Sequence, residues 1–135
     1  MVSRLRALAF CLAVTIGGCH APTASGLGDA QRACTSGASH VEVHLTGSIT
    51  RYLGTRSSAS GVHEGFLVTV SSAPASVLTV EDNVNMTGFI PLRRGDAVEL
   101  QGQYECNDGV IHWTHHDPAG RHIAGYVIVN GRRFQ

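Results

Sequence analysis

The chain of 135 residues contains no lysine, and its ten basic residues are all arginine. Arginine favours bidentate contacts with anions, but a GC-rich genome produces the same bias, and we attribute the bias to the genome. Ten acidic residues balance the arginines, and without residues 1–18, which hold two arginines, the formal net charge becomes −2. Because a domain that binds nucleic acid is usually basic, this charge argues against nucleic acid as a partner.

Long hydrophobic runs are also missing. The apolar stretch at residues 7–16 is shorter than the about 20 residues that a membrane-spanning helix needs. Arg4 and Arg6 precede it, and a positive start followed by a short apolar run is typical of an export signal. We therefore expect the protein to function outside the cytoplasm.

The apolar stretch ends in Ile16-Gly17-Gly18-Cys19, which resembles the bacterial lipobox, where small residues precede a cysteine that receives lipid. The resemblance implies that residues 1–18 are a lipoprotein signal peptide and that Cys19 anchors the protein to a membrane. His20 follows in place of Asp, which resembles lipoproteins sorted to the outer membrane, here facing the periplasm. The alternative is an ordinary secretory signal on a secreted or periplasmic protein.

Cysteine is scarce, with four in the chain. Cys11 leaves with the signal peptide and Cys19 is assigned to lipid, so Cys34 and Cys106 remain in an oxidising compartment. We predict a disulfide between them, worth about 4 kcal/mol in the chain-entropy model because it closes a long loop. A cysteine metal site is the weaker alternative, since the chain lacks the short CxxC spacing of zinc sites.

The chain divides into a short polar segment and one domain. Residues 19–39 are small, polar and glycine-rich without a hydrophobic period, which predicts a flexible tether. Residues 40–135 have the size of a single compact domain. Apolar residues alternate with polar ones through this domain, which predicts β-strands with one buried face. The residues assigned to that face are Val41, Val43, Leu45, Ile49, Phe66, Val68, Val70, Val98, Leu100 and Tyr104.

Turn signals complete the fold prediction. Asn107-Asp108-Gly109 and Asn130-Gly131 are typical of tight hairpins, and the second predicts a C-terminal hairpin that ends near Phe134. A longer irregular connection separates the third strand, near Val77–Val80, from the fourth. This pattern matches an all-β fold, a small five-stranded OB-like Greek-key barrel with a C-terminal hairpin. A β-sandwich is the main alternative, because the number of strands does not determine whether the sheet closes into a barrel.

Histidine is concentrated in residues 110–122, which hold four of the eight histidines and the single tryptophan. In a continuous strand, Ile111 and Trp113 would share the core face, and His112 and His116 would lie about 13 Å apart on the other. One metal ion could not join those two histidines unless the strand bends. Pro118 ends strand pairing and therefore favours a compact site at the end of the segment.

Three roles remain open for this segment. The side chains can brace a corner through hydrogen bonds, with Arg121 paired to Asp117. They can bind a divalent transition metal, and the candidate ligands are His116, Asp117 and His122. They can catalyse hydrolysis, with His115 or His116 as the base and Arg121 stabilising negative charge. Candidate ligand-binding residues are His112, Trp113 and Asp117. The sequence has no Gly-x-Ser-x-Gly, HExxH or phosphate-binding glycine motif to decide between them.

Three further groups of polar residues carry weaker signals. His40 and His44 flank Glu42 on one strand face, which we expect to be solvated and near the fourth strand. Residues 81–83 follow the third strand and read as a turn cap. The role of residues 63–64 depends on whether the barrel brings His63 near His112.

The segment GVIHWTHHDPAGRHIAGYVIVNGRRFQ, with GDAVELQGQYECN and GVHEGFLVTV before it, resembles an uncharacterised family of small exported bacterial proteins with an HWTH motif. The resemblance covers about His44 to the end and implies that the histidine-rich segment acts as a unit. Family members often have Gln at the position of Glu64, a histidine near Glu81 and Trp at the position of Cys106. The missing histidine puts a family-wide site in doubt here, and Cys106 fits a disulfide particular to this chain.

We therefore expect a periplasm-facing lipoprotein that carries a ligand-binding OB-like domain. Its histidine-rich edge would bind a metal or a polar anionic ligand. One alternative is a metal- or histidine-dependent hydrolase of phosphodiesters or envelope polymers. Another is a structural envelope component that docks a protein partner through its open edge.

Overall fold

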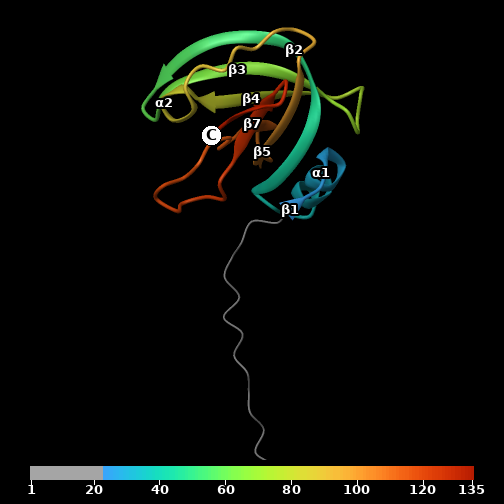
Figure 1. Ribbon diagram of the computed structural model, residues 1–135. Coiled ribbons are helices and arrows are strands. Elements are labelled where there is room, and N and C mark those ends of the chain that lie inside the picture. Colours follow the sequence, from blue (N-terminus) through green and yellow to red (C-terminus); the bar gives the residue numbers. More distant parts are fainter. Residues whose placement is uncertain (1–22) are drawn as a thin grey trace, which may run out of the picture.

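The computed structural model describes residues 23–135 (Figure 1). The predicted signal peptide and Cys19 lie outside these residues. The elements in chain order are β1 (Thr23–Ala24), α1 (Leu27–Thr35), β2 (His40–Ser58), β3 (Gly61–Val70), β4 (Val77–Asn83), α2 (Val84–Thr87), β5 (Ala97–Glu105), β6 (Val110–His112), β7 (Tyr126–Val129) and β8 (Arg132–Phe134). Neither helix of the described part is long and apolar enough to cross a membrane.

All described strands belong to one hydrogen-bonded sheet, so the all-β prediction is confirmed. The pairings run from β2 through β3, β4, β6 and β5, and β5 pairs again with β2, which makes a ring. Pairing is antiparallel except between β4 and β6 and between β1 and β2. The sheet has eight strands rather than five, because the C-terminal hairpin joins it through β7 on β5 and β1 adds a strand beside β2.

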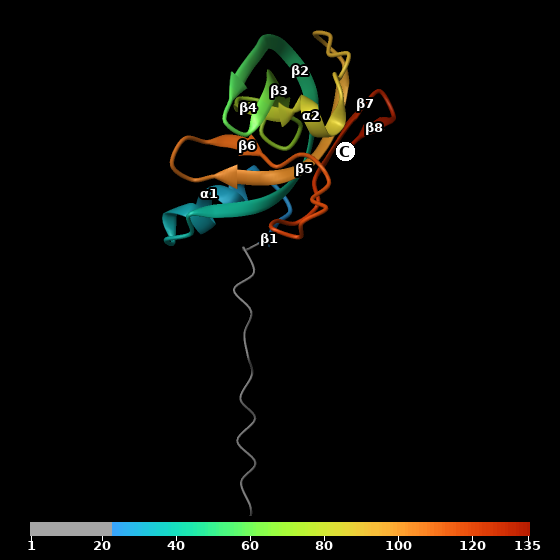
Figure 2. The same cartoon turned by 90° about the vertical axis from the view of Figure 1, so that its left-hand side faces the viewer.

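The long strand β2 connects the two sides of the ring, curving across the molecule (Figures 1 and 2). Its first half pairs with β5 and its second half with β3, and the two pairings overlap at Gly47 and Ser48. A Cβ atom at Gly47 would lie 2.2 Å from the carbonyl oxygen of Thr69. Only glycine therefore allows β2 to approach β3 at the point where it changes partner.

The core fills the inside of the ring. All ten residues that the alternation assigned to the buried face on β2, β3 and β5 are at most 9% exposed. The same inner face continues on β4 and β6 with Val80 and Ile111, both fully buried. Period-two alternation therefore located the hydrophobic core correctly, because the face of each residue on a pleated strand follows from its position.

The tether predicted for residues 19–39 needs correction from residue 23 onward. Residues 23 and 24 pair in parallel with β2, and α1 follows with Leu27 and Ala30 buried (Figure 2). The apolar face of this helix has only two buried positions, too few to show a helical period against small neighbours. The predicted disulfide is confirmed: Cys34 in α1 is bonded to Cys106 after β5, with Cα atoms 5.5 Å apart.

Candidate functional site

The histidine-rich segment does not continue as a strand. β6 ends at His112, and Trp113 adopts a left-handed conformation with φ 57°. This turn exchanges the expected faces of two residues: Trp113 is 37% exposed instead of buried, and Thr114 is buried instead of exposed, whereas His115 is buried as the alternation predicts. A left-handed residue breaks the alternation of a strand, and no feature of the local sequence marks Trp113 as the position of the turn. The prediction that Trp113 fills the core is therefore wrong.

Asp117 holds the loop that follows. Its Oδ1 accepts the backbone N–H of Ala119 at 2.9 Å, and its Oδ2 accepts those of Arg121 and His122. Burial of the carboxyl group raises its pKa, but these three N–H donors and the nearby His122 ring outweigh burial and lower the pKa to about 2. Asp117 therefore has the bracing role that the sequence suggested, because three backbone N–H groups of the loop donate hydrogen bonds to its oxygens.

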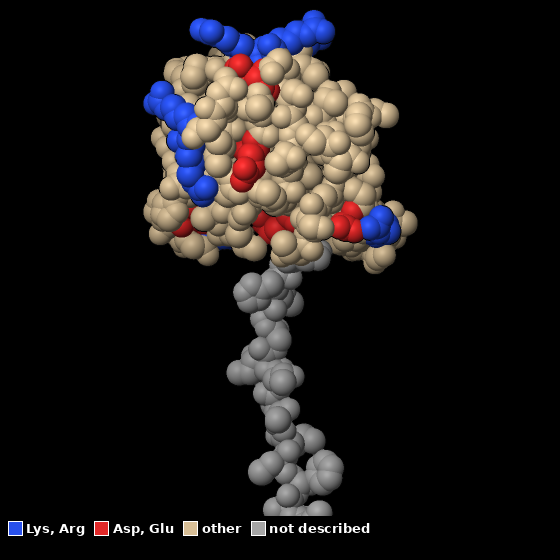
Figure 3. All heavy atoms as spheres, turned by 45° about the vertical axis from the view of Figure 1, so that its right-hand side comes forward, with Lys and Arg blue, Asp and Glu red and all other residues tan. Residues whose placement is uncertain are grey.

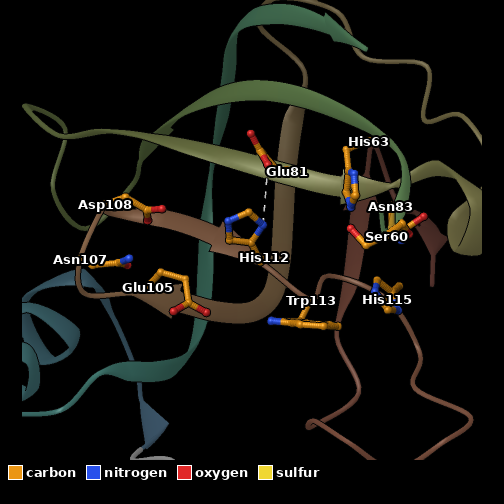
Figure 4. Close-up of a pocket in the computed structure, with 10 residues that line it drawn as sticks. All are labelled: Ser60, His63, Glu81, Asn83, Glu105, Asn107, Asp108, His112, Trp113 and His115. Atoms are coloured by element: carbon orange, nitrogen blue, oxygen red, sulfur yellow. Dashed lines mark hydrogen bonds and ion pairs between the residues drawn. The ribbon is translucent and has the colours of Figure 1, made fainter. Parts of the chain in front are cut away.

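A cleft of about 350 Å³ opens beside this loop, on the outer side of β3, β4 and β6 (Figure 4). His63 of β3 and His112 of β6 both line it, which answers whether the fold brings them together. Glu105, Asn107 and Asp108 lie at one end of it, Ser60, His63 and Asn83 lie at the other, and Trp113 lies along one side. The lining residues are Ser60, His63, Glu81, Asn83, Glu105, Asn107, Asp108, His112, Trp113 and His115.

Glu81 lines the cleft and takes part in two ion pairs. Arg56 of β2 binds both carboxylate oxygens, one of them through Nε at 3.1 Å. On the cleft side, the Nδ1 atom of His112 lies 3.8 Å from Oε2 of the same carboxylate (Figure 4). A bidentate arginine fixes the carboxylate plane, so Glu81 presents a fixed acceptor to His112 and to the cleft.

Two carboxylates lie inside the ring next to the cleft. Asp82, expected to cap a turn, points inward and accepts hydrogen bonds from the hydroxyls of Thr87 and, at 2.7 Å, Thr114. Glu64 is its register partner on β3 and accepts the N–H of Ile90 at 2.8 Å. Burial raises the pKa of both groups, against the lowering effect of these hydrogen bonds. The alternation on β4 continues from the core to residue 82, a signal that could have placed Asp82 inside.

His115 and His122 form a pair of rings next to Trp113. Their centroids are 5.0 Å apart with the planes at 90°. The Trp113 ring is 4.6 Å from that of His122 and 6.0 Å from that of His115. The Nδ1 atom of each histidine lies against the carbonyl oxygen of the next residue, at 2.8 Å for His115 and 2.7 Å for His122. The ring of His122 is therefore held within the loop, and that of His115 reaches the cleft.

The other predicted site residues lie apart from this group. His116 is exposed and does not line the cleft. The Arg121 side chain is 70% exposed, and its Nε lies 3.7 Å from Asp117 Oδ1. Among residues 23–135, no three His, Cys, Asp or Glu side chains form a group that could hold a metal ion. The predicted ligand set therefore needs correction, because Asp117 and His122 come together without His116.

The polar face of β2 is adjacent to β5, as expected, with His44 Nε2 bonded to Glu99 Oε1 at 3.0 Å. Glu42 differs from the expectation of a solvated residue, since it is 3% exposed. β1 pairs alongside it, and Gln103 donates to its Oε1 at 2.9 Å. This carboxylate is therefore buried and bonded to β5 rather than solvated.

The fold and the site together define a small all-β protein with a histidine-rich cleft on the outside of a ring of strands. Residues 12–135 match the family described as Protein of unknown function (DUF3465), and the chain belongs to this family. Neither a curated protein nor a solved structure matches the chain.

Proposed function

We propose that the protein is a periplasm-facing lipoprotein whose OB-like domain binds a polar ligand in the cleft. The cleft itself supports this proposal, because about 350 Å³ falls within the range of about 300–1,000 Å³ for small-molecule sites. The ring order β2-β3-β4-β6-β5 supports the OB-like assignment. Proteins of that fold use the face of their second and third strands to bind oligosaccharides and oligonucleotides, and His63 and Asn83 lie on the corresponding pair.

The lining favours a polyhydroxylated ligand over an anionic one. It contains the carboxylates Glu81, Glu105 and Asp108, and no arginine is among the described residues that line it. Carboxylate and amide oxygens accept hydrogen bonds from hydroxyl groups. The half-exposed ring of Trp113 offers an apolar surface for the C–H face of a sugar. An oligosaccharide of the cell envelope therefore fits this chemistry best.

The charge distribution also disfavours a nucleic acid. On the face in Figure 3, arginine side chains are scattered at the margins, and acidic side chains lie between them. Binding a phosphate backbone requires several basic side chains along one path. Formal neutrality of the whole chain agrees with this view.

The lipid anchor would hold the cleft near the membrane. The described part begins at Thr23, four residues after Cys19, and four residues of chain span at most about 14 Å. Detergent phase partition tests the anchor: the wild-type protein should enter the detergent phase, and Cys19→Ser should remain in the aqueous phase. Equal partition of both would contradict lipid attachment at Cys19.

Calorimetric titration with a trimer of N-acetylglucosamine and with soluble peptidoglycan fragments tests the ligand class. We expect binding that weakens at least tenfold in Glu105→Gln and Trp113→Ala, about 1.4 kcal/mol. Phe89→Ala is the matched control, because Phe89 is 67% exposed and lies outside the cleft lining. No heat with any sugar, or equal affinity in all variants, would reject a glycan site in this cleft.

A second candidate function is hydrolysis of an envelope polymer. The observation that favours it is that His115 lines the cleft and interacts electrostatically with the buried carboxylate of Asp82. His115 would act as the base, since His116 and Arg121 lie outside the lining. Release of reducing ends from peptidoglycan, with a bell-shaped pH profile lost in His115→Gln, would establish it. Binding without turnover would leave the protein a binding module.

A further inference from the structure

His115 and His122 each have one ring nitrogen that the protein does not use. A carbonyl oxygen only accepts hydrogen bonds, so the Nδ1 atom of each ring must carry the proton that it donates. In a neutral imidazole the proton then leaves Nε2 with a free lone pair. Two perpendicular rings with centroids 5.0 Å apart therefore share one tautomer, with both Nε2 atoms available as ligands.

The Nε2 atom of His122 is buried and has no hydrogen-bond partner. The whole side chain is only 4% exposed. The nearest carboxylate oxygen, Oδ2 of Asp117, is 3.8 Å away and already accepts two backbone N–H groups. Buried polar atoms in native proteins almost always have a partner, so this nitrogen requires one that the polypeptide does not supply.

We propose that His115 and His122 bind a transition-metal ion through their Nε2 atoms, with copper(II) preferred to zinc. Histidines that ligate metals usually donate the other ring N–H to a carbonyl or carboxylate, as both do here. Imidazole suits copper and zinc, and the Irving–Williams order places copper(II) above zinc. The negative charge of Asp117 nearby offsets part of the charge of the ion.

Two protein ligands leave coordination positions open. Because no third His, Cys, Asp or Glu of residues 23–135 completes a group, water or a ligand in the cleft must fill the other positions. His115 also lines the cleft, which gives the ion a route to the pair. This site differs from the set expected from the sequence, because His115 takes the place of His116. It is also independent of whether the cleft binds a glycan.

Trp113 is a built-in reporter, as the only tryptophan in the chain. Its ring centroid lies 4.6 Å and 6.0 Å from those of the two histidines, so bound copper(II) should quench its emission. The experiment titrates copper(II) chloride, and separately zinc chloride, into the untagged full chain without sugar. Calorimetry gives the stoichiometry, and fluorescence reports the location.

We expect one copper ion per chain, bound at least tenfold more tightly than zinc, with quenching of Trp113. His115→Gln and His122→Gln should each weaken copper binding at least tenfold and abolish quenching at equimolar copper. The controls are His116→Gln, which removes an exposed histidine of the same loop, and His44→Gln, which removes one on β2. Both controls should bind copper as the wild-type protein does.

Binding without quenching, or quenching that survives in His115→Gln, would overturn the proposal and indicate adventitious binding at exposed histidines. Absence of binding, or tighter binding of zinc, would also overturn it. If His122→Gln fails to fold, as judged by circular dichroism, His115→Gln alone decides, because its ring reaches the cleft. Glu105→Gln separates the two proposals, since it should lose the sugar and keep copper.

Discussion

Glu64 and Asp82 face each other across the pairing of β3 and β4, and both carboxylates are buried inside the ring. Burial is the main cause of the raised pKa of each group, and the negative charge of Asp82 raises that of Glu64 further. The native state therefore retains protons at pH values where the unfolded chain has lost them. These two residues couple the stability of the fold to pH.

Asp82→Asn should remove part of this coupling. A raised pKa in the folded state makes the free energy of unfolding fall as pH rises above the ordinary aspartate range. The wild-type protein should therefore lose stability relative to Asp82→Asn between pH 4 and pH 8. Urea unfolding at both pH values measures the difference. The control is Asp29→Asn, because Asp29 is exposed. The prediction would be contradicted if the difference in free energy of unfolding between the wild-type protein and Asp82→Asn did not change with pH.

The disulfide between Cys34 and Cys106 should contribute about 4 kcal/mol to the free energy of unfolding, because its sequence separation is 72 residues. Reduction, or the double substitution Cys34→Ser and Cys106→Ser, should lower stability by up to this amount. Amide hydrogens of α1 should exchange faster, since the bond ties the helix to the end of β5. Urea unfolding with and without reductant measures the loss. If reductant also destabilised the double variant, the loss of stability would have a cause other than this disulfide.

Asp117→Asn should loosen the loop without unfolding the ring. An amide side chain has one acceptor oxygen, so it cannot satisfy the three N–H groups of Ala119, Arg121 and His122 equally. Hydrogen exchange at these amides should accelerate, while exchange in β2 and β5 stays slow. Arg121→Gln is the control for the exposed ion pair, which should be worth at most about 1 kcal/mol. Equal effects of both substitutions would mean that charge, rather than backbone bonding, holds the loop.

The parts of the fold that depend on local pattern could be predicted from the sequence. Faces of the strands follow from alternation, and the turns at residues 107–109 and 130–131 follow from their Asn and Gly residues. The disulfide follows from the expected oxidising compartment and from the number of cysteines. The first two inferences use residues that are close in sequence. The third has few alternatives, because only two cysteines remain to pair.

The parts that depend on tertiary contacts could not be predicted. Trp113 is left-handed although tryptophan has no preference for this conformation, and its carbonyl oxygen lies against Gly125. The inward face of Asp82 follows from the alternation on β4, but its partner Thr114 comes from a distant segment that the sequence does not place beside it. His115 lines the cleft and His116 is exposed, because the chain no longer alternates as a strand after the turn at Trp113.

Gly125 packs against the backbone of this turn. A Cβ atom there would lie 2.1 Å from the carbonyl oxygen of Trp113 and 2.7 Å from that of Gln101, and both are backbone atoms that cannot rotate away. Gly125→Ala should therefore shift the loop away from β5, change the emission of Trp113 and lower stability by about 1–3 kcal/mol. Gly28→Ala in α1 is the matched control, because its nearest neighbour is the flexible end of Arg32 at 3.5 Å. There alanine should stabilise the helix by about 0.5–1 kcal/mol. Thermal unfolding and tryptophan fluorescence measure both variants, and a Gly125→Ala protein with unchanged emission and melting temperature would show that the loop is not set by this contact.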